Sequence, residues 1–200
     1  MDDKWNKKYG SSEFVYGREP NSFLKENLHT ITSGNRILSL GEGEGRNAIF
    51  LLKNGFKVTA IDQSIVGLNK ATRWALELGL HLDTICDDLK FYPQEENQWD
   101  AIINIFAHMY PDERIKMHHR IEKALKVGGV YILEAYTVDQ LQFDTGGPKE
   151  LDLFMSLSEL KKELSHLHFE VQKEHIKEIR EGIGHFGKSA VVSIIARKLA

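Results

Sequence analysis

One stretch of the sequence decides the fold: Leu38-Ser-Leu-Gly-Glu-Gly-Glu-Gly-Arg-Asn-Ala48. It begins inside an apolar run, residues 36–40, that predicts a strand, and it leads into a helical pattern that starts at Asn47. The glycines at 41, 43 and 45 allow the backbone to turn sharply and to approach a bound molecule without side-chain collision. The stretch therefore predicts a strand, a ligand-binding turn and a helix in succession.

Outward from this stretch, apolar runs rich in β-formers alternate with helical patterns. Further strands are predicted at residues 57–61, 81–86, 99–106, 130–134, 169–179 and 190–196. The run 99–106 is nearly continuous in apolar residues, as expected of a central strand buried on both faces. The alternation predicts an α/β fold with a doubly wound, mostly parallel sheet and helices on both faces.

The predicted helices carry their own start and stop signals. Ser64 is placed to cap one helix, and Ser156 with Glu159 has the spacing of a capping box before another. Pro111 begins a helix that runs through residue 125, and the pair Gly128-Gly129 is predicted to end it.

Length, charge and cysteine content limit the possible functions. A chain of 200 residues with 42% apolar content fits a single domain, residues 1–200. A net charge of -3 and a pI near 6.3 argue against a nucleic-acid partner. The single cysteine, Cys86, cannot form an internal disulfide, and the sequence shows neither a secretory signal nor a membrane span. We therefore expect a cytoplasmic protein without membrane contact.

Two acidic residues follow neighbouring strands at the edge where the ligand crevice of such a sheet lies. Asp62 ends the second strand, 21 residues after Gly41, where a carboxylate can accept hydrogen bonds from ribose hydroxyls. Asp88 follows the third strand and can meet an adenine amino group, with Leu89 against the ring. Together with the glycine turn, these residues predict an adenosine-containing cofactor.

The spacing of the glycines bears on which cofactor this is. The dinucleotide fingerprint is G-x-G-x-x-G, whereas here Gly45 comes one residue early and Arg46 takes the third-glycine position. A pyrophosphate would meet Glu42 and Glu44 in its own cradle, but a sulfonium and an ammonium group tolerate nearby carboxylates. Both features favour S-adenosylmethionine (SAM) over NAD.

The sequence also resembles a known family. The stretch 38–48, Val58-Thr-Ala-Ile-Asp62, Cys86-Asp-Asp-Leu89 and Leu125-Lys-Val-Gly-Gly129 look like the successive signatures of class I SAM-dependent methyltransferases. Trp5-Asn-Lys-Lys-Tyr9 and Tyr16-Gly-Arg-Glu-Pro-Asn-Ser-Phe-Leu24 look like the subgroup of tellurite-resistance and thiopurine methyltransferases.

The resemblance implies a Rossmann-like seven-stranded sheet with an antiparallel last strand, and methyl transfer from SAM. The residues expected to hold the cofactor are Gly41, Glu42, Gly43, Gly45, Arg46, Asn47, Asp62, Gln63, Asp88, Leu89 and Ile105. Ser39 departs from the pattern, because many members carry an acidic residue there that faces the methionine end of the cofactor. Glu42 and Glu44 are the candidates to replace it.

The methyl acceptor is expected beyond the fourth and fifth strands, where His108, Tyr110 and Tyr136 lie. By the same resemblance, Arg180 and His185 are candidate acceptor-site residues, and with His108 they form the predicted catalytic set. The expected acceptor is a small molecule such as a thiol, tellurite or selenite.

The remaining histidines are interpreted as structural. His118 and His119 fall in the middle of a predicted helix and are expected to be surface residues. His166 and His168 have no further ligand at suitable spacing, so we predict no metal site.

The amino-terminal residues 1–30 are too aromatic for a disordered tail. Trp5, Tyr9 and Tyr16 are expected to form a lid over the cofactor, and Tyr110 and Tyr136 complete the predicted substrate and lid set. Two alternatives stay open at this point: a SAM-binding regulatory protein without turnover, and an NAD-dependent oxidoreductase. The oligomeric state is open as well.

Overall fold

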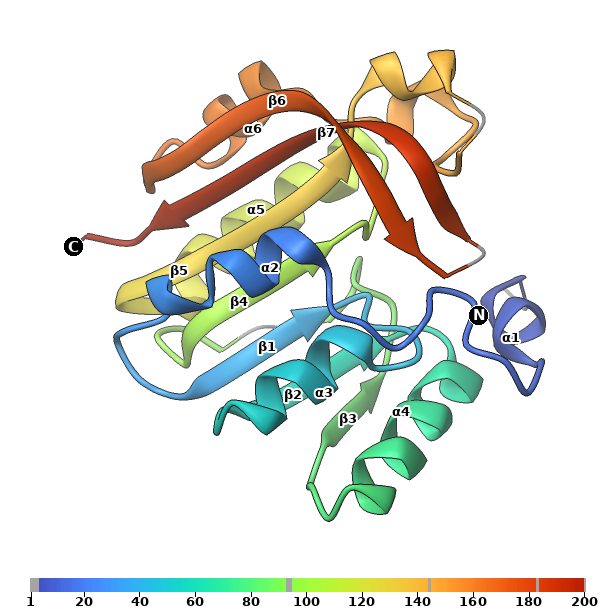
Figure 1. The fold of residues 1–200 in the computed structure, drawn as a ribbon. Coiled ribbons are helices and arrows are strands. Elements are labelled where there is room, and N and C mark those ends of the chain that lie inside the picture. Colours follow the sequence, from blue (N-terminus) through green and yellow to red (C-terminus); the bar gives the residue numbers. More distant parts are fainter. Residues whose placement is uncertain (1–3, 93–94, 144, 183, 200) are drawn as a thin grey trace.

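The core of the structure, a computed structural model, is one seven-stranded sheet (Figure 1). The structure describes residues 4–92, 95–143, 145–182 and 184–199. The strands are β1 (Arg36–Leu40), β2 (Lys57–Asp62), β3 (Asp83–Cys86), β4 (Trp99–Ile105), β5 (Leu125–Tyr136), β6 (His168–Glu181) and β7 (His185–Arg197). Their order is β3-β2-β1-β4-β5-β7-β6, and only β7 runs against its neighbours β5 and β6. The predicted sheet, with its antiparallel last strand, is therefore confirmed.

Helices cover both faces of the sheet (Figure 1). The helices of the chain are α1 (Lys4–Tyr9), α2 (Ser22–Glu26), α3 (Arg46–Lys53), α4 (Ile65–Glu77), α5 (Pro111–Ala124) and α6 (Leu157–Glu163), with short 3-10 turns η1 (Leu28–Thr30), η2 (Val138–Gln142) and η3 (Leu151–Leu153). Residues of α2, α3 and α4 pack in one apolar cluster, and residues of α5 and α6 pack in a second on the opposite face. The central strand β4 is buried along its whole length between them.

Local sequence signals position these elements. The Ser64 hydroxyl accepts a hydrogen bond from the Gly67 N–H at the start of α4, as expected of an N-cap. Ser156 and Glu159 form a complete capping box at the start of α6. Gly55 and Gly79 have positive φ just after α3 and α4, as is common where a glycine ends a helix.

The prediction for Gly128-Gly129 is wrong. Helix α5 ends at Ala124, and Leu125 already begins β5, which pairs with Trp99 of β4. The next pair is Ala101 with Val130, so the β5 segment holding both glycines bulges out of the ladder. A Cβ on Gly129 would lie 2.8 Å from the Lys126 carbonyl oxygen and 3.0 Å from that of Trp99. The glycines therefore allow a bulge in the strand instead of a helix end.

The carboxyl ends of β1 and β4 lie side by side at the point where the chain switches direction across the sheet. Helix α1 lies at this same end of the sheet, as do the end of β6 and the start of β7 (Figure 1). Within the described residues, no helix is both long and apolar enough to cross a membrane.

Candidate cofactor and acceptor site

The glycine turn after β1 needs glycine at each of its three positions. Gly41, Gly43 and Gly45 have φ of 60°, 63° and 94°, a region that favours glycine. A Cβ on Gly41 would lie 2.6 Å from the Ala107 Cβ, and a Cβ on Gly45 would lie 2.6 Å from the Ala71 Cβ. The turn is therefore held tightly between the segment after β4 and helix α4.

The Glu42 carboxylate occupies the start of α3. Its Oε1 accepts hydrogen bonds from the N–H groups of Asn47 and Ala48 at 3.0 and 2.8 Å, and its Oε2 accepts one from the Ser39 hydroxyl. The side chain is buried, and burial raises the pKa of Glu42. Glu42 thus brings an acidic group to the Ser39 position, where many members of the resembled family carry an acidic side chain.

The Asp62 carboxylate joins the turn to the end of β2. It accepts hydrogen bonds from the Gly43 N–H at 2.8 Å and from the Ser64 N–H at 2.7 Å. Burial raises the pKa of Asp62, and each carboxylate oxygen keeps a lone pair for a further donor. Of the other predicted cofactor residues, Ile105 is buried at the end of β4, and Gln63, Asp88 and Leu89 are half-buried near the ends of β2 and β3.

Glu44 points away from the turn. Its carboxylate accepts a hydrogen bond from the Val15 N–H at 2.8 Å and forms an ion pair with Lys70. Lys70 thus compensates the charge of Glu44, and Glu42 is the carboxylate that contacts Ser39.

The amino-terminal segment covers the glycine turn. Tyr9 is buried, and a Cβ on Gly43 would lie 2.6 Å from its hydroxyl oxygen. Trp5 stacks on Tyr9 with ring centroids 5.6 Å apart, and Asn6 accepts a hydrogen bond from the Ser64 hydroxyl at 2.8 Å. Burial and the nearby Asp62 raise the pKa of Tyr9, so its hydroxyl stays protonated.

Arg46 and Asn47, both predicted cofactor residues, connect the turn to other segments. The Arg46 guanidinium pairs with the Glu181 carboxylate at 2.7 Å, and Asn47 Oδ1 accepts a hydrogen bond from the Asn21 N–H at 2.9 Å. The Asn21 side-chain amide donates to both Glu181 and Glu134, at 2.9 and 2.8 Å. Sequence reasoning missed Glu181, because an alternating charged strand gives no sign of which carboxylate turns inward.

Five rings form a cluster on the acceptor side: Tyr16, Phe106, His108, Tyr136 and His185. The His185 ring lies 4.5 Å from that of Tyr16 and 4.8 Å from that of Phe106, between centroids. The Tyr136 ring lies 4.6 Å from Phe106 and 5.8 Å from His108. The structure thus brings together the predicted residues His108, Tyr136, His185 and Tyr16.

Two predicted acceptor-site residues lie outside this cluster. Arg180 is exposed near the end of β6, where its neighbour Glu181 is the side chain that lies beside His185. Tyr110 is exposed and donates a hydrogen bond to the Glu150 carboxylate at 2.6 Å. Tyr136 is fully buried at the end of β5.

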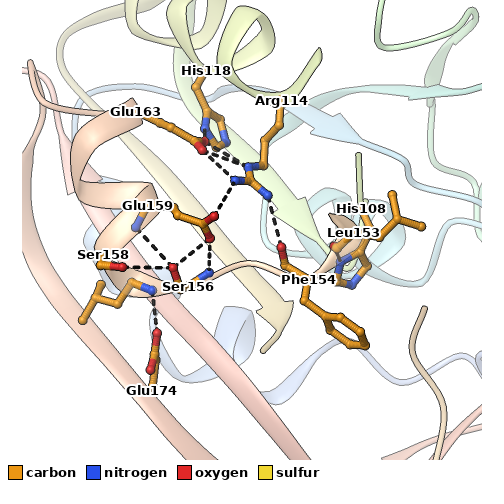
Figure 2. Close-up of polar contacts among 11 residues, drawn as sticks. His108, Arg114, His118, Leu153, Phe154, Ser156, Ser158, Glu159, Glu163 and Glu174 are labelled. Atoms are coloured by element: carbon orange, nitrogen blue, oxygen red, sulfur yellow. Dashed lines mark hydrogen bonds and ion pairs between the residues drawn. The ribbon is translucent and has the colours of Figure 1, made fainter. Parts of the chain in front are cut away.

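The prediction that His118 is a surface residue is wrong, whereas His119 is exposed as expected. His118 Nδ1 lies 2.7 Å from Glu163 Oε2, and Arg114 binds the same carboxylate at 2.7 to 3.1 Å (Figure 2). Arg114 also donates to the Phe154 carbonyl, next to the Leu153 carbonyl that contacts His108 Nδ1 at 2.8 Å. The cluster Arg114–His118–Glu163 therefore fixes α6 and the residues that hold His108.

The residues present fit S-adenosylmethionine. The three glycines form a tight turn in which a Cβ would collide with neighbouring protein atoms, and Asp62 keeps acceptor capacity for ribose hydroxyls. Glu42 supplies the buried acidic group at the Ser39 position, on the side expected for the positively charged methionine end. The helix N-terminus is already used by Glu42, so a pyrophosphate would lose that anion site.

Comparisons with known proteins agree with this geometry. Residues 37–129 match the family described as "Methyltransferase domain". A curated relative, the tRNA N(3)-cytidine methyltransferase METTL2 of Bos taurus, is 30% identical over 118 residues. The match covers 56% of this chain and only 30% of that relative, so the chain spans less than a third of the relative's length.

Solved structures share the whole fold at low sequence identity. A structure concerning conversion of a disulfide bond into a thioacetal group during echinomycin biosynthesis superposes with a TM-score of 0.81, at 15% identity, over 100% of this chain and 92% of the other. TehB from Haemophilus influenzae gives 0.72 at 21% identity over 98% and 66% of the two chains.

A SAM-dependent methyltransferase from Methanosarcina mazei gives a TM-score of 0.70 at 19% identity over 86% and 96% of the two chains. Residues 37–129 thus match a methyltransferase domain, and the chain has the fold that the solved SAM-dependent methyltransferase shares.

Proposed function

We propose that this chain transfers a methyl group from SAM to a small-molecule acceptor. The observation that carries the proposal is the glycine turn, which lies between the buried carboxylates Glu42 and Asp62. When bound there, SAM supplies an activated methyl group on a sulfonium. The chain's own task is then to align the acceptor, exclude water and remove a proton if one must leave.

The acceptor side supports a small substrate. The ring cluster lies beneath the amino-terminal segment, which reaches from Tyr9 on the glycine turn to Tyr16 on His185. An acceptor bound beside these rings would be covered by this segment. Thiols, tellurite and selenite are the first candidates, because soft nucleophiles need little help from a base.

A second candidate acceptor is a transfer RNA. The observation that favours it is the 30% identity to a tRNA methyltransferase over 118 residues. The net charge of -3 and the pI near 6.3 argue against tRNA. A chain without excess positive charge releases few counterions when it binds a phosphate backbone.

The test combines binding with turnover. Calorimetric titration with SAM is expected to show one site, and release of S-adenosylhomocysteine (SAH) is expected with at least one member of a panel of thiols, tellurite, selenite and small amines. SAM binding without SAH release from any acceptor would instead indicate a regulatory protein. Release only with tRNA would contradict the small-molecule proposal.

A further inference from the structure

A line of buried side chains runs from the cofactor edge of the sheet to the cluster Arg114–His118–Glu163. Asn104 Nδ2 donates a hydrogen bond to the Tyr131 hydroxyl at 3.0 Å, and this hydroxyl lies 3.3 Å from His118 Nε2. His118 Nδ1 lies 2.7 Å from Glu163 Oε2. Asn104, Tyr131 and His118 are each 0% exposed, so solvent does not compete for these bonds. We call these five residues the buried polar network; they join β4, β5, α5 and α6.

The Glu163 end of the buried polar network sets the direction of each hydrogen bond in it. Although burial opposes it, hydrogen bonds from His118 and Arg114 lower the pKa of Glu163, so the ionised carboxylate can only accept. Burial lowers the pKa of His118, and the one hydrogen of the neutral ring lies on Nδ1, toward Glu163. His118 Nε2 then accepts the Tyr131 hydroxyl hydrogen, and the Tyr131 oxygen accepts from the Asn104 amide nitrogen. The Asn104 oxygen is therefore left to face the other way.

The Asn104 oxygen shapes the backbone at the end of β4. It accepts a hydrogen bond from the Ala107 N–H at 3.2 Å, which closes a turn over residues 104–107 that we call the β4 turn. Within the β4 turn, Phe106 has φ of 60°, a conformation that bulky residues adopt only where their surroundings enforce it. The Asn104 amide is thus one of the groups that hold this backbone in place.

The β4 turn lies against the glycine turn. A Cβ on Gly41 would lie 2.6 Å from the Ala107 Cβ, so the Ala107 methyl group packs directly on the first glycine. The next residue, His108, contacts the Leu153 carbonyl through Nδ1 at 2.8 Å, and Arg114 donates to the following carbonyl of the chain (Figure 2). The buried polar network therefore holds this segment from two sides.

We propose that Asn104 is a positioning residue for the cofactor site: its amide holds the β4 turn against Gly41, and the buried polar network fixes which end of the amide faces the turn. Asn104 acts through the Ala107 N–H. The inference rests on the cofactor site of the proposed methyl transfer and adds to it a residue outside the glycine motif. Local sequence does not mark Asn104, because Tyr131 and His118, which orient it, come from other elements.

Calorimetry with SAH tests the inference without turnover. Asn104→Leu removes the acceptor of the Ala107 N–H, and we expect it to weaken SAH binding by about tenfold, the size of one lost hydrogen bond. Asn104→Asp keeps an oxygen acceptor there and is expected to bind SAH within about threefold of the wild-type protein. Tyr131→Phe keeps the ring but no longer orients the amide, so we expect SAH binding to weaken by at least about threefold.

Hydrogen exchange of backbone amides, followed by nitrogen-15 NMR, separates positioning from a general loss of stability. We expect the Ala107 N–H to exchange faster in Asn104→Leu and Tyr131→Phe than in the wild-type protein. The control is Val58→Ala, a buried substitution near the start of β2, which should lower stability without changing SAH affinity or Ala107 exchange. The ring nitrogens of His118 are expected to show hydrogen on Nδ1.

Three results would overturn the inference: wild-type SAH affinity in a folded Asn104→Leu or Tyr131→Phe variant, equal weakening by Asn104→Asp and Asn104→Leu, or His118 with hydrogen on Nε2. If Asn104→Leu does not fold, Tyr131→Phe and the His118 tautomer decide. Failure of the wild-type protein to bind SAH would instead contradict the proposed function.

Discussion

Ser39 and Glu42 form a buried hydrogen-bonded pair beside the glycine turn. The Ser39 hydroxyl donates to the buried Glu42 carboxylate, and Glu42 in turn accepts two N–H groups from the start of α3. Hydrogen bonds to a buried charge contribute more than neutral ones, because the alternative is an unsatisfied carboxylate.

Replacing Ser39 by alanine removes the only side-chain donor in this arrangement that the described residues show for Glu42. We expect Ser39→Ala to lower the free energy of unfolding by about 1.5–3 kcal/mol, the range for a hydrogen bond to a charged group. Urea denaturation measures the change, and the exposed Ser12→Ala is the matched control. Equal stability of the two variants would show that the bond contributes nothing.

Asp62 carries the expected contact with the cofactor ribose. Asp62→Ala also removes the acceptor of the Gly43 and Ser64 N–H groups. We therefore expect the substitution to weaken ribose binding and to change the conformation of the turn. We expect SAM binding to be lost in calorimetry while cooperative unfolding persists. The exposed Asp83→Ala should bind normally. Full SAM affinity in the Asp62 variant would contradict the assigned contact.

At the scale of the elements, the buried cluster Arg114–His118–Glu163 links helix α6 to helix α5 (Figure 2). Arg114 is 1% exposed and forms three hydrogen bonds to Glu163, which also contacts His118. Removing one member of a buried ion pair leaves an uncompensated charge, which costs about 3–5 kcal/mol.

We therefore expect Arg114→Met to lower the free energy of unfolding by about 3–5 kcal/mol, measured by urea denaturation. Lys161→Ala, at an exposed position of α6, is the control and should change stability by less than about 0.5 kcal/mol. A small effect of the Arg114 variant would mean that apolar packing alone holds α6.

Buried histidines also set a pH dependence. Burial lowers the pKa of His108 to about 4 and also lowers the pKa values of His118 and His185. The unfolded chain therefore binds protons first, and the stability present above about pH 6.5 is lost as the pH falls toward 4. His108 alone accounts for at most about 3 kcal/mol of this loss.

Denaturation at several pH values checks this expectation. His108→Gln should show a shallower loss of stability between about pH 6.5 and 4 than the wild-type chain does. His29→Gln, at an exposed position, should leave the slope unchanged. The same slope in all three proteins would contradict the burial of a neutral His108.

Some elements were predictable from local sequence, and others were not. Ser64, the capping box at Ser156 and the apolar run of β4 act within a few residues, so the sequence showed them. The strand position of Gly128-Gly129 depends on pairing with β4. His118 is buried only because Glu163, 45 residues later, folds back onto α5.

Some residues of the candidate site were likewise predictable from local sequence, and others were not. The glycine turn and Asp62 follow from a local pattern and from the ends of parallel strands. Glu181 could not be found, since its partners Arg46 and Asn21 lie more than a hundred residues away in the chain. Contacts of such separation are fixed by the packing of the whole molecule.

At the scale of the whole molecule, the amino-terminal segment joins the cofactor side to the acceptor side. The Tyr9 side chain packs against Gly43, and the Val15 carbonyl accepts a hydrogen bond from the Gly184 N–H at 3.1 Å. We propose that this segment is a lid that keeps water from the transferring methyl group.

The lid proposal predicts that Tyr9→Ala weakens SAM binding by about tenfold, or 1.4 kcal/mol, because the cover over the turn is lost. Calorimetry measures the affinity, and Tyr110→Ala, at an exposed position outside the ring cluster, is the control. Unchanged affinity in the Tyr9 variant would show that the segment packs on the turn without covering the cofactor.

The most direct measurement for the central claim is calorimetric titration of the wild-type chain with SAM and, separately, with NADH. The paired carboxylates Glu42 and Asp62 beside the glycine turn predict saturable binding of SAM at one site per chain and no heat with NADH. Binding of NADH without binding of SAM would contradict the account.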